Sequence, residues 1–214
     1  MTDICKHEGN RVLLVEGKND CHVILALCSQ YKLAETFGIH ECGSDISLLK
    51  RLNALILQPD SPEIIGIVLD ADSPDIMRRW QQIQQKIKTH KYTFPKSPPP
   101  GGTILQGNEG RPTIGIWLMP DNKKSGMLED FLMEMANKEA LQIAENCITN
   151  AKEKGMTTYK QGHHSKALIH TWLSWQDEPG RPLGQAITAN VLKPETKLAK
   201  SFINWLKKLF GSYT

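Results

Sequence analysis

The most informative segment of this 214-residue chain reads Ile64-Ile65-Gly66-Ile67-Val68-Leu69-Asp70-Ala71-Asp72-Ser73-Pro74. Its unbroken apolar run is rich in β-branched residues and is typical of a strand that is buried on both faces. Ser73 and Pro74 then favour the start of a helix, as N-cap and first helical residue. A buried strand that delivers Asp70 and Asp72 just before a helix indicates the crevice at the carboxyl edge of an open α/β sheet. We therefore expect this Asp-x-Asp to be the centre of an acidic, metal-binding site.

The segments around this strand predict a parallel sheet. Strands are expected at residues 11–15, 37–42 and 64–70, and helices follow them at residues 21–31, from residue 45, and at residues 74–88. The second of these helices carries an apolar stripe at helical spacing, formed by Ile46, Leu49, Leu52 and Ile56. A strand–helix order that is repeated three times is typical of a parallel sheet with right-handed crossovers.

The regular alternation stops at residues 94–102, a proline-rich segment that is expected to be an extended loop. Two more strands are predicted at residues 103–105 and 113–119, joined as a hairpin. From residue 137 the patterns are only helical, at residues 138–154, 165–176 and 195–210. The predicted fold class is therefore α/β, with a mostly parallel sheet flanked by helices at residues 1–136 and a helical extension at residues 137–214.

The composition, 40% hydrophobic and 23% charged residues, is that of an ordinary soluble globular protein. No apolar run has the length of a membrane span, and the polar first ten residues lack a signal region, so we expect a cytoplasmic protein without membrane contact. The five cysteines are odd in number and contain no Cys-x-x-Cys pair, which predicts reduced thiols and no zinc site. Cys21 and Cys28 are expected to be core residues.

The charge is distributed unevenly along the chain. Residues 1–150 hold 16 lysines and arginines against 19 acidic residues, a net charge of −3, whereas residues 151–214 hold 10 against 4, a net charge of +6. A basic rear part beside an acidic front part suits a metal site that faces a polyanion such as nucleic acid. The alternative is that the surplus lysines only keep a helical surface soluble.

Three groups of acidic residues follow predicted strands. They are Glu16 with Asp20, Asp70 with Asp72, and Asp121 with the later Glu129 and Asp130. Strand ends of a parallel sheet meet at one edge, where like charges repel strongly unless a cation shares them. Mg²⁺ and similar hard ions prefer such oxygen ligands, and two bridged ions are the usual device for phosphodiester cleavage.

Each of these residues also has a simpler structural interpretation. Asp72, Asp20, Glu129 and Asp130 also suit the first turn of a helix, where a carboxylate favours the helix dipole. Lys18 is a candidate to contact a phosphate, or it neutralises the carboxylates. Lys166 and His170, four residues apart on one face of a predicted helix, are candidates to bind a phosphate or to orient an attacking water. The tryptophans of residues 165–176 are expected in the core. Glu16 has no evident structural task.

Two motifs resemble a Toprim domain, the fold shared by topoisomerases, primases and OLD-type nucleases. They are Leu13-Leu14-Val15-Glu16-Gly17-Lys18-Asn19-Asp20 and Ile67-Val68-Leu69-Asp70-Ala71-Asp72. The resemblance implies a Rossmann-like sheet, a catalytic role for Glu16, and Mg²⁺ binding by Asp70 and Asp72. Asp20 and the later Leu128-Glu129-Asp130 are more similar to the OLD-type nucleases, which use two metals.

Three further segments, at residues 115–122, 126–131 and 167–175, are similar to a small bacterial Toprim-like family of undefined function. The chain departs from the better-known relatives, because residues 1–214 include no tyrosine-bearing cleavage domain, helicase or ATPase domain. The resemblance therefore implies a nuclease that acts alone, as a homo-oligomer, or with a separately encoded protein partner.

The expected function is Mg²⁺- or Mn²⁺-dependent hydrolysis of phosphodiester bonds in nucleic acid. The residues expected to catalyse it are Glu16, Lys18, Asp70, Asp72 and Lys166. The expected metal ligands are Glu16, Asp20, Asp70, Asp72, Asp121, Glu129 and Asp130. Two alternatives stay open: a non-catalytic module that binds a metal or a basic partner, and a phosphatase of the haloacid-dehalogenase type with Asp70 as its nucleophile.

Overall fold

The computed structural model describes residues 3–71, 75–108 and 110–211, and in this part of the chain the strands form one sheet in the order β2-β1-β3-β5-β4. The strands are β1 (Arg11–Val15), β2 (Gly38–Glu41), β3 (Ile64–Asp70), β4 (Thr103–Leu105) and β5 (Thr113–Met119). All neighbouring pairs are parallel except β4 with β5, which is antiparallel. The predicted mostly parallel α/β sheet and the predicted hairpin are therefore confirmed.

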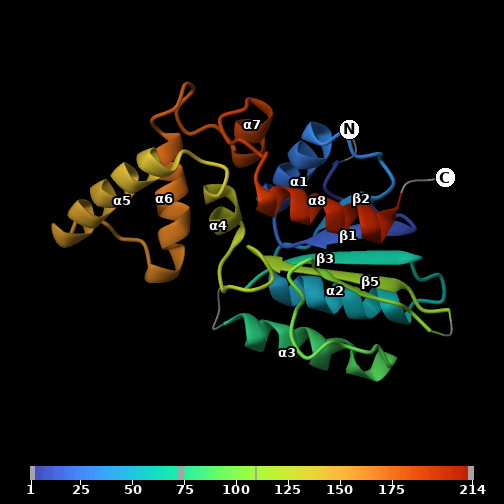
Figure 1. Ribbon diagram of the computed structural model, residues 1–214. Helices are drawn as coiled ribbons and strands as arrows, with labels where there is room; N and C mark the ends of the chain where they lie inside the picture. The colour runs from blue at the N-terminus through green and yellow to red at the C-terminus, as the bar shows by residue number, and fades with distance from the viewer. Residues whose placement is uncertain (1–2, 72–74, 109, 212–214) are drawn as a thin grey trace.

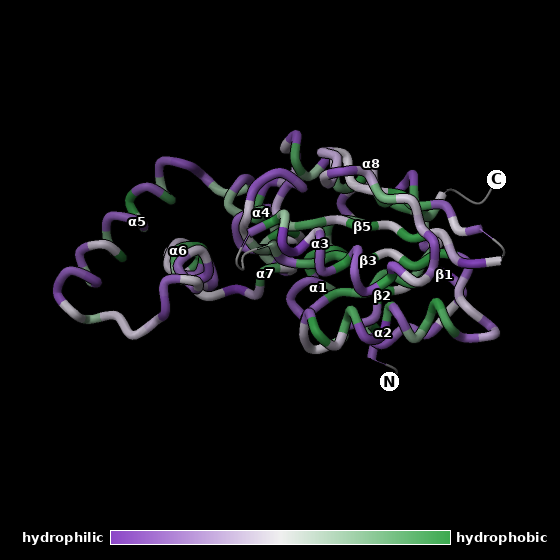
Figure 2. Tube along the Cα trace, turned by 90° about the horizontal axis from the view of Figure 1, so that it is seen from below, coloured by the Kyte–Doolittle hydropathy of each residue, from purple (hydrophilic) through white to green (hydrophobic). Residues whose placement is uncertain are grey.

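Helices cover both faces of the sheet (Figure 1). One face carries α2 (Asp45–Leu57) and α3 (Ile76–Ile87), and the other carries α1 (Lys18–Gln30) and α8 (Lys197–Phe210), with α7 (Leu183–Thr188) packed against α1. The helices α4 (Leu128–Met133), α5 (Lys138–Glu153) and α6 (His164–Leu173) lie beyond one end of the sheet. Figure 2 shows hydrophobic residues concentrated along the central strands, whereas most of α5 is hydrophilic. The sheet thus has one apolar core on each face.

The last helix packs unusually close to the sheet because two glycines face it. Gly66 of β3 and Gly115 of β5 are partners in register. A Cβ atom at Gly115 would lie 2.1 Å from Cδ2 of Leu209, and one at Gly66 would lie 3.1 Å from the same atom. The side of α8 that faces the sheet is apolar, and its residues Phe202, Trp205, Leu206 and Leu209 are buried.

Gly115→Ala is expected to lower the free energy of unfolding by about 1–3 kcal/mol, because the added methyl group overpacks the contact with Leu209. Urea denaturation measures this change. Gly101→Ala is the matched control, since a Cβ there meets nothing within 4 Å. Equal stability of the two variants would contradict the close packing of α8.

Several local predictions need correction. The first helix begins at Lys18 rather than at residue 21, and α7 was not predicted. The N-cap of α3 is Asp75, whose Oδ1 accepts a hydrogen bond from the backbone N–H of Arg78 at 2.9 Å; Ser73 and Pro74 lie outside the described residues. Ile46 was expected in the apolar stripe of α2 but is 62% exposed, because it sits in the first turn, beyond the contact with the sheet.

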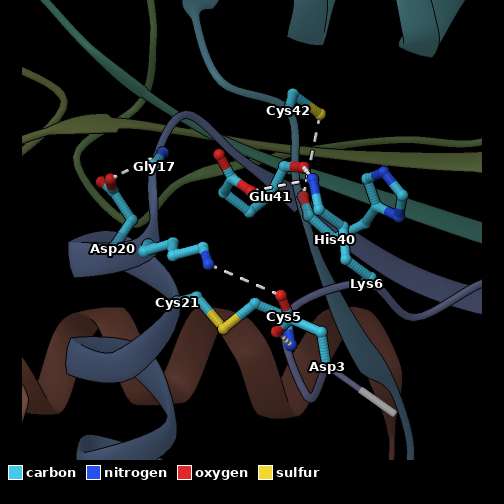
Figure 3. The surroundings of a disulfide bond; sticks show 10 residues. Asp3, Cys5, Lys6, Gly17, Asp20, Cys21, His40, Glu41 and Cys42 are labelled. Atoms are coloured by element: carbon cyan, nitrogen blue, oxygen red, sulfur yellow. Dashed lines mark hydrogen bonds and ion pairs between the residues drawn. A yellow bond between two sulfur atoms is a disulfide. The ribbon is translucent and has the colours of Figure 1, made fainter.

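The prediction of five reduced thiols is wrong for Cys5 and Cys21, which form a disulfide bond (Figure 3). The segment that carries Cys5 runs beside β2, where the backbone N–H of Glu41 donates to the carbonyl of Cys5 at 2.8 Å. Cys21 faces this segment from the first turn of α1. The pairing depends on this tertiary contact, which the spacing of the cysteines does not reveal. Cys28, Cys42 and Cys147 are free thiols.

Cys5→Ser is expected to lower the free energy of unfolding by about 3 kcal/mol, since the bond closes a loop with a sequence separation of 16 residues. Reduction of the wild-type protein with a dithiol is expected to have the same effect. Thermal unfolding measures both. Cys147→Ser is the control, because Cys147 is exposed and unpaired. Identical unfolding with and without the reductant would show that the bond does not form in solution.

Candidate functional site

A pocket of about 470 Å³ opens at the carboxyl edge of the sheet, between the ends of β1 and β3 and the starts of α1, α4 and α6. Four of its lining side chains are carboxylates: Glu16, Asp20, Asp70 and Glu129. Its lining also includes basic side chains and an imidazole: Lys18, Lys166 and His163. The structure therefore brings together four of the predicted acidic residues and both predicted lysines.

Hydrogen bonds join the ends of the two central strands to the helix that follows β5. The backbone N–H of Asp70 donates to Oε1 of Glu16 at 2.8 Å. On the other side of the strand end, Oδ1 of Asp70 accepts from the backbone N–H of Leu128 at 2.9 Å. Glu16 and Asp70 are thus held in place by backbone groups, and Asp70 connects β3 to the first residue of α4.

Glu16 ionises at an unusually high pH. Burial raises the pKa of its carboxyl from 4.5 to about 7, against the hydrogen bond from the Asp70 backbone, which lowers it. Repulsion from Asp20 raises this pKa further, and the nearby Arg79 guanidinium lowers it. A carboxylate that exchanges its proton near neutral pH is suited to act as a general base.

Asp20 and Glu129 form a second acidic pair deeper in the pocket. Asp20 is 9% exposed and Glu129 is 5% exposed. Burial raises the pKa of Asp20 to about 6, the hydrogen bond from the Gly17 backbone N–H opposes this, and the charge of Glu129 adds to it. Nζ of Lys166 lies 3.7 Å from Oε1 of Glu129 and compensates part of the repulsion.

Two other predicted ligands, Asp121 and Asp130, lie outside the lining of the pocket. Oδ1 of Asp121 accepts backbone N–H bonds from the two lysines that follow in its turn. Asp130 accepts from the Met127 backbone N–H at 2.8 Å and from the Ser165 hydroxyl at 2.7 Å. Neither aspartate lines the pocket, so a ligand role for them stays a prediction. Asp72 lies outside the described residues.

The helix α6 brings Lys166 but not His170 to the pocket. His170 is solvent-exposed. Trp172 is buried as expected, whereas Trp175 is 46% exposed, so the prediction of a core position is wrong for it, because α6 ends at Leu173. Lys18 is mostly exposed, with its Nζ 3.7 Å from Oδ2 of Asp3.

Sequence reasoning missed Arg79 of α3, a buried arginine that bonds to a residue of the pocket. Its Nε donates to the backbone carbonyl of Asp70 at 2.9 Å, and its Nη1 donates to Oδ2 of Asp45 at 2.7 Å. The signal was present in the sequence, since Arg79 interrupts the apolar stripe of Ile76, Trp80 and Ile83. An arginine in such a stripe is buried only when its charge is paired.

The chemistry of the acidic side chains fits a hard divalent cation. Across residues 3–71, 75–108 and 110–211, no three His, Cys, Asp and Glu side chains converge as ready ligands of one ion. Mg²⁺ does not require such a cage, since it is commonly held by one or two carboxylates and completes its shell with water and substrate phosphate. Glu16, Asp20, Asp70 and Glu129 line one pocket and supply carboxylates of this kind.

None of the helices in the described ranges is long and apolar enough to cross a membrane.

No curated protein and no solved structure matches the chain. One family model does match it, over residues 10–211, and is described as "Protein of unknown function (DUF3226)". Because this match covers nearly the whole sequence, the chain belongs to the DUF3226 family.

Proposed function

We propose that this protein is a Toprim-like nuclease that hydrolyses phosphodiester bonds of nucleic acid with Mg²⁺ or Mn²⁺. The observation that carries the proposal is the pocket itself, in which carboxylates from the end of β1, the start of α1, the end of β3 and the start of α4 converge. Burying several acidic side chains together opposes folding. A binding site for cations gives this arrangement a function.

The residues divide into two groups. Glu16 and Asp70, with Asp72, would hold one ion, and Asp20 with Glu129 would hold a second. A bound divalent ion would supply Lewis-acid activation of the phosphate and a lower pKa for the attacking water. In the metal-free protein the pKa of the Glu16 carboxyl is about 7, and this side chain would accept the proton from that water.

Lysine side chains at the rim complete the proposed site. Lys166 lies beside Glu129 and Lys18 lies at the start of α1, and both line the pocket. Their ammonium groups attract a nucleic-acid phosphate and offset the acidity that would otherwise repel it. The net charge of +6 on residues 151–214 adds to this attraction.

The Toprim assignment rests on the Glu-Gly and Asp-x-Asp motifs and is supported by a mostly parallel sheet that places Glu16 beside Asp70. The proposed partners are nucleic acid and either a second copy of the chain or a separately encoded protein. The proposed location is the cytoplasm. The Cys5–Cys21 disulfide instead favours an oxidising compartment, so the redox state of this pair in cells tests the location.

The test compares two glutamates of one short segment. Glu129 is buried in the pocket, whereas Glu134, the C-cap residue of α4, pairs with Lys138 at the surface. With labelled DNA and RNA and Mn²⁺, we expect wild type and Glu134→Gln to cleave, and Glu129→Gln to cleave at least ~10-fold more slowly. A chelator is expected to abolish cleavage.

Other outcomes separate the alternatives. Mn²⁺ binding without cleavage of either nucleic acid would favour the non-catalytic module. A phosphorylated Asp70 after incubation with an aryl phosphate would favour the phosphatase. Cleavage that persists in Glu129→Gln and in the presence of a chelator would contradict the proposed site.

A further inference from the structure

Arg79 is the one buried arginine among the described residues, and it bonds to the backbone of Asp70, which lines the acidic pocket. Its side chain is 7% exposed. Besides its bonds to the Asp70 carbonyl and the Asp45 carboxylate, its Nη1 donates to Oε1 of Gln82 at 3.1 Å. The guanidinium therefore joins the last residue of β3 to the first residue of α2.

The Arg79 guanidinium bonds to the backbone of β3 in addition to its ion pair with Asp45. Burying a guanidinium costs several kcal/mol, and its ion pair with Asp45 offsets this cost without any contact with β3. Nevertheless Nε is directed at the backbone carbonyl of Asp70. Only a planar, forked donor bonds a carboxylate and a carbonyl in fixed directions at once, and lysine lacks this geometry.

Asp70 is consequently held at three atoms. Its N–H donates to Glu16, its Oδ1 accepts from the Leu128 backbone, and its carbonyl accepts from Arg79. The first two bonds belong to the pocket, whereas the third comes from α3 on the face of the sheet below it. Arg79 thus fixes the Asp70–Ala71 peptide plane, which adjoins the Cα atom that carries the carboxylate.

We propose that Arg79, oriented by Asp45, is a positioning residue that holds the carboxylate of Asp70 in the geometry needed to bind the divalent cation. This inference rests on the proposed function and extends it to a residue that contacts neither substrate nor metal. Side chains that hydrogen-bond to metal-binding residues commonly contribute about 10–100-fold to metal affinity or activity, which is lost when they are removed.

The experiment compares Arg79→Lys and Arg79→Gln with Arg78→Gln, whose parent side chain is exposed on the same helix. Mn²⁺ affinity is measured by calorimetry without nucleic acid, and kcat and KM are measured with it. We expect both Arg79 variants to bind Mn²⁺ about 10–100-fold more weakly and to lose kcat, with an unchanged KM for nucleic acid. Arg78→Gln is expected to match wild type.

A purely structural role predicts a different result, in which the variants unfold more easily but the folded fraction binds Mn²⁺ normally. Circular dichroism measures that fraction, and normal affinity in it would overturn the inference. Asp45→Asn provides a second route if Arg79→Gln does not fold. Because Asp45 acts through Arg79, its substitution is expected to weaken Mn²⁺ binding in wild type and to have no further effect in Arg79→Lys.

The two proposals fail differently. A wild-type protein that neither binds Mn²⁺ nor cleaves nucleic acid overturns the proposed function, and the role of Arg79 falls with it. A wild-type protein that does both, beside Arg79 variants that match Arg78→Gln, overturns the role of Arg79 alone.

Discussion

Glu16→Gln is expected to stabilise the protein at pH 8 while it abolishes cleavage. The pKa of Glu16 is about 7 in the folded protein, against 4.5 for the ordinary side chain. The folded state therefore binds the proton more tightly than the unfolded state does. This contribution to stability is fully present below about pH 4.5 and is lost as the pH rises through 7.

The expected size of the effect is on the order of a few kcal/mol, because each pKa unit corresponds to about 1.4 kcal/mol. The glutamine keeps an oxygen that accepts from the Asp70 backbone N–H but carries no charge to desolvate. Urea denaturation at pH 4 and at pH 8 measures the difference. The variant is expected to exceed wild type at pH 8 and to equal it at pH 4.

Asp20 contributes in the same direction, since its pKa of about 6 lies above its ordinary value of 3.8. Wild type is therefore expected to lose stability between about pH 4 and pH 7 in metal-free buffer, and the loss should shrink when Mn²⁺ is added. Glu134→Gln is the control, because Glu134 is exposed. A Glu16→Gln protein that is less stable than wild type at pH 8 would mean that the fold requires this charge.

The convergence of the carboxylates could be predicted because it follows from topology. Glu16 and Asp70 each follow a parallel strand, and carboxyl ends of neighbouring parallel strands meet at the same edge. Topology alone does not distinguish the roles of Glu129 and Asp130. They are adjacent in the sequence, yet Glu129 lines the pocket and Asp130 caps α4. Successive residues of a helix are rotated by about 100°, so the two side chains point in different directions. The sequence does not define which of them faces the pocket.

The features that sequence reasoning missed all depend on contacts between distant segments. Arg79 is buried because Asp45, 34 positions earlier, pairs with it. Cys5 bonds Cys21 because the first residues run beside β2. Asp121 follows a strand, as Glu16 does, and so has the sequence position expected of a ligand. Its carboxylate nevertheless accepts hydrogen bonds from backbone N–H groups of its own turn. Local patterns identify a strand, a helix or a cap, whereas the choice between a cap and a ligand is made by the packed structure.

Asp70→Asn is expected to reduce cleavage by about 10³-fold with little change in stability. Asparagine keeps the Oδ1 acceptor for the backbone N–H of Leu128, so the link between β3 and α4 is retained. What it removes is the negative charge, and loss of several kcal/mol of metal-mediated stabilisation of the transition state corresponds to a factor of this size. Initial rates with saturating Mn²⁺ measure the loss.

Two further substitutions separate the charge of Asp70 from its hydrogen bond. Asp70→Ala removes both and leaves the Leu128 N–H without its acceptor, so we expect an additional loss of about 1–3 kcal/mol in unfolding free energy. Asp75→Asn is the matched control, because asparagine caps α3 as well as aspartate does. If Asp70→Asn cleaves as fast as Asp75→Asn, the carboxylate of Asp70 serves only to join β3 to α4, and the chemistry lies elsewhere in the pocket.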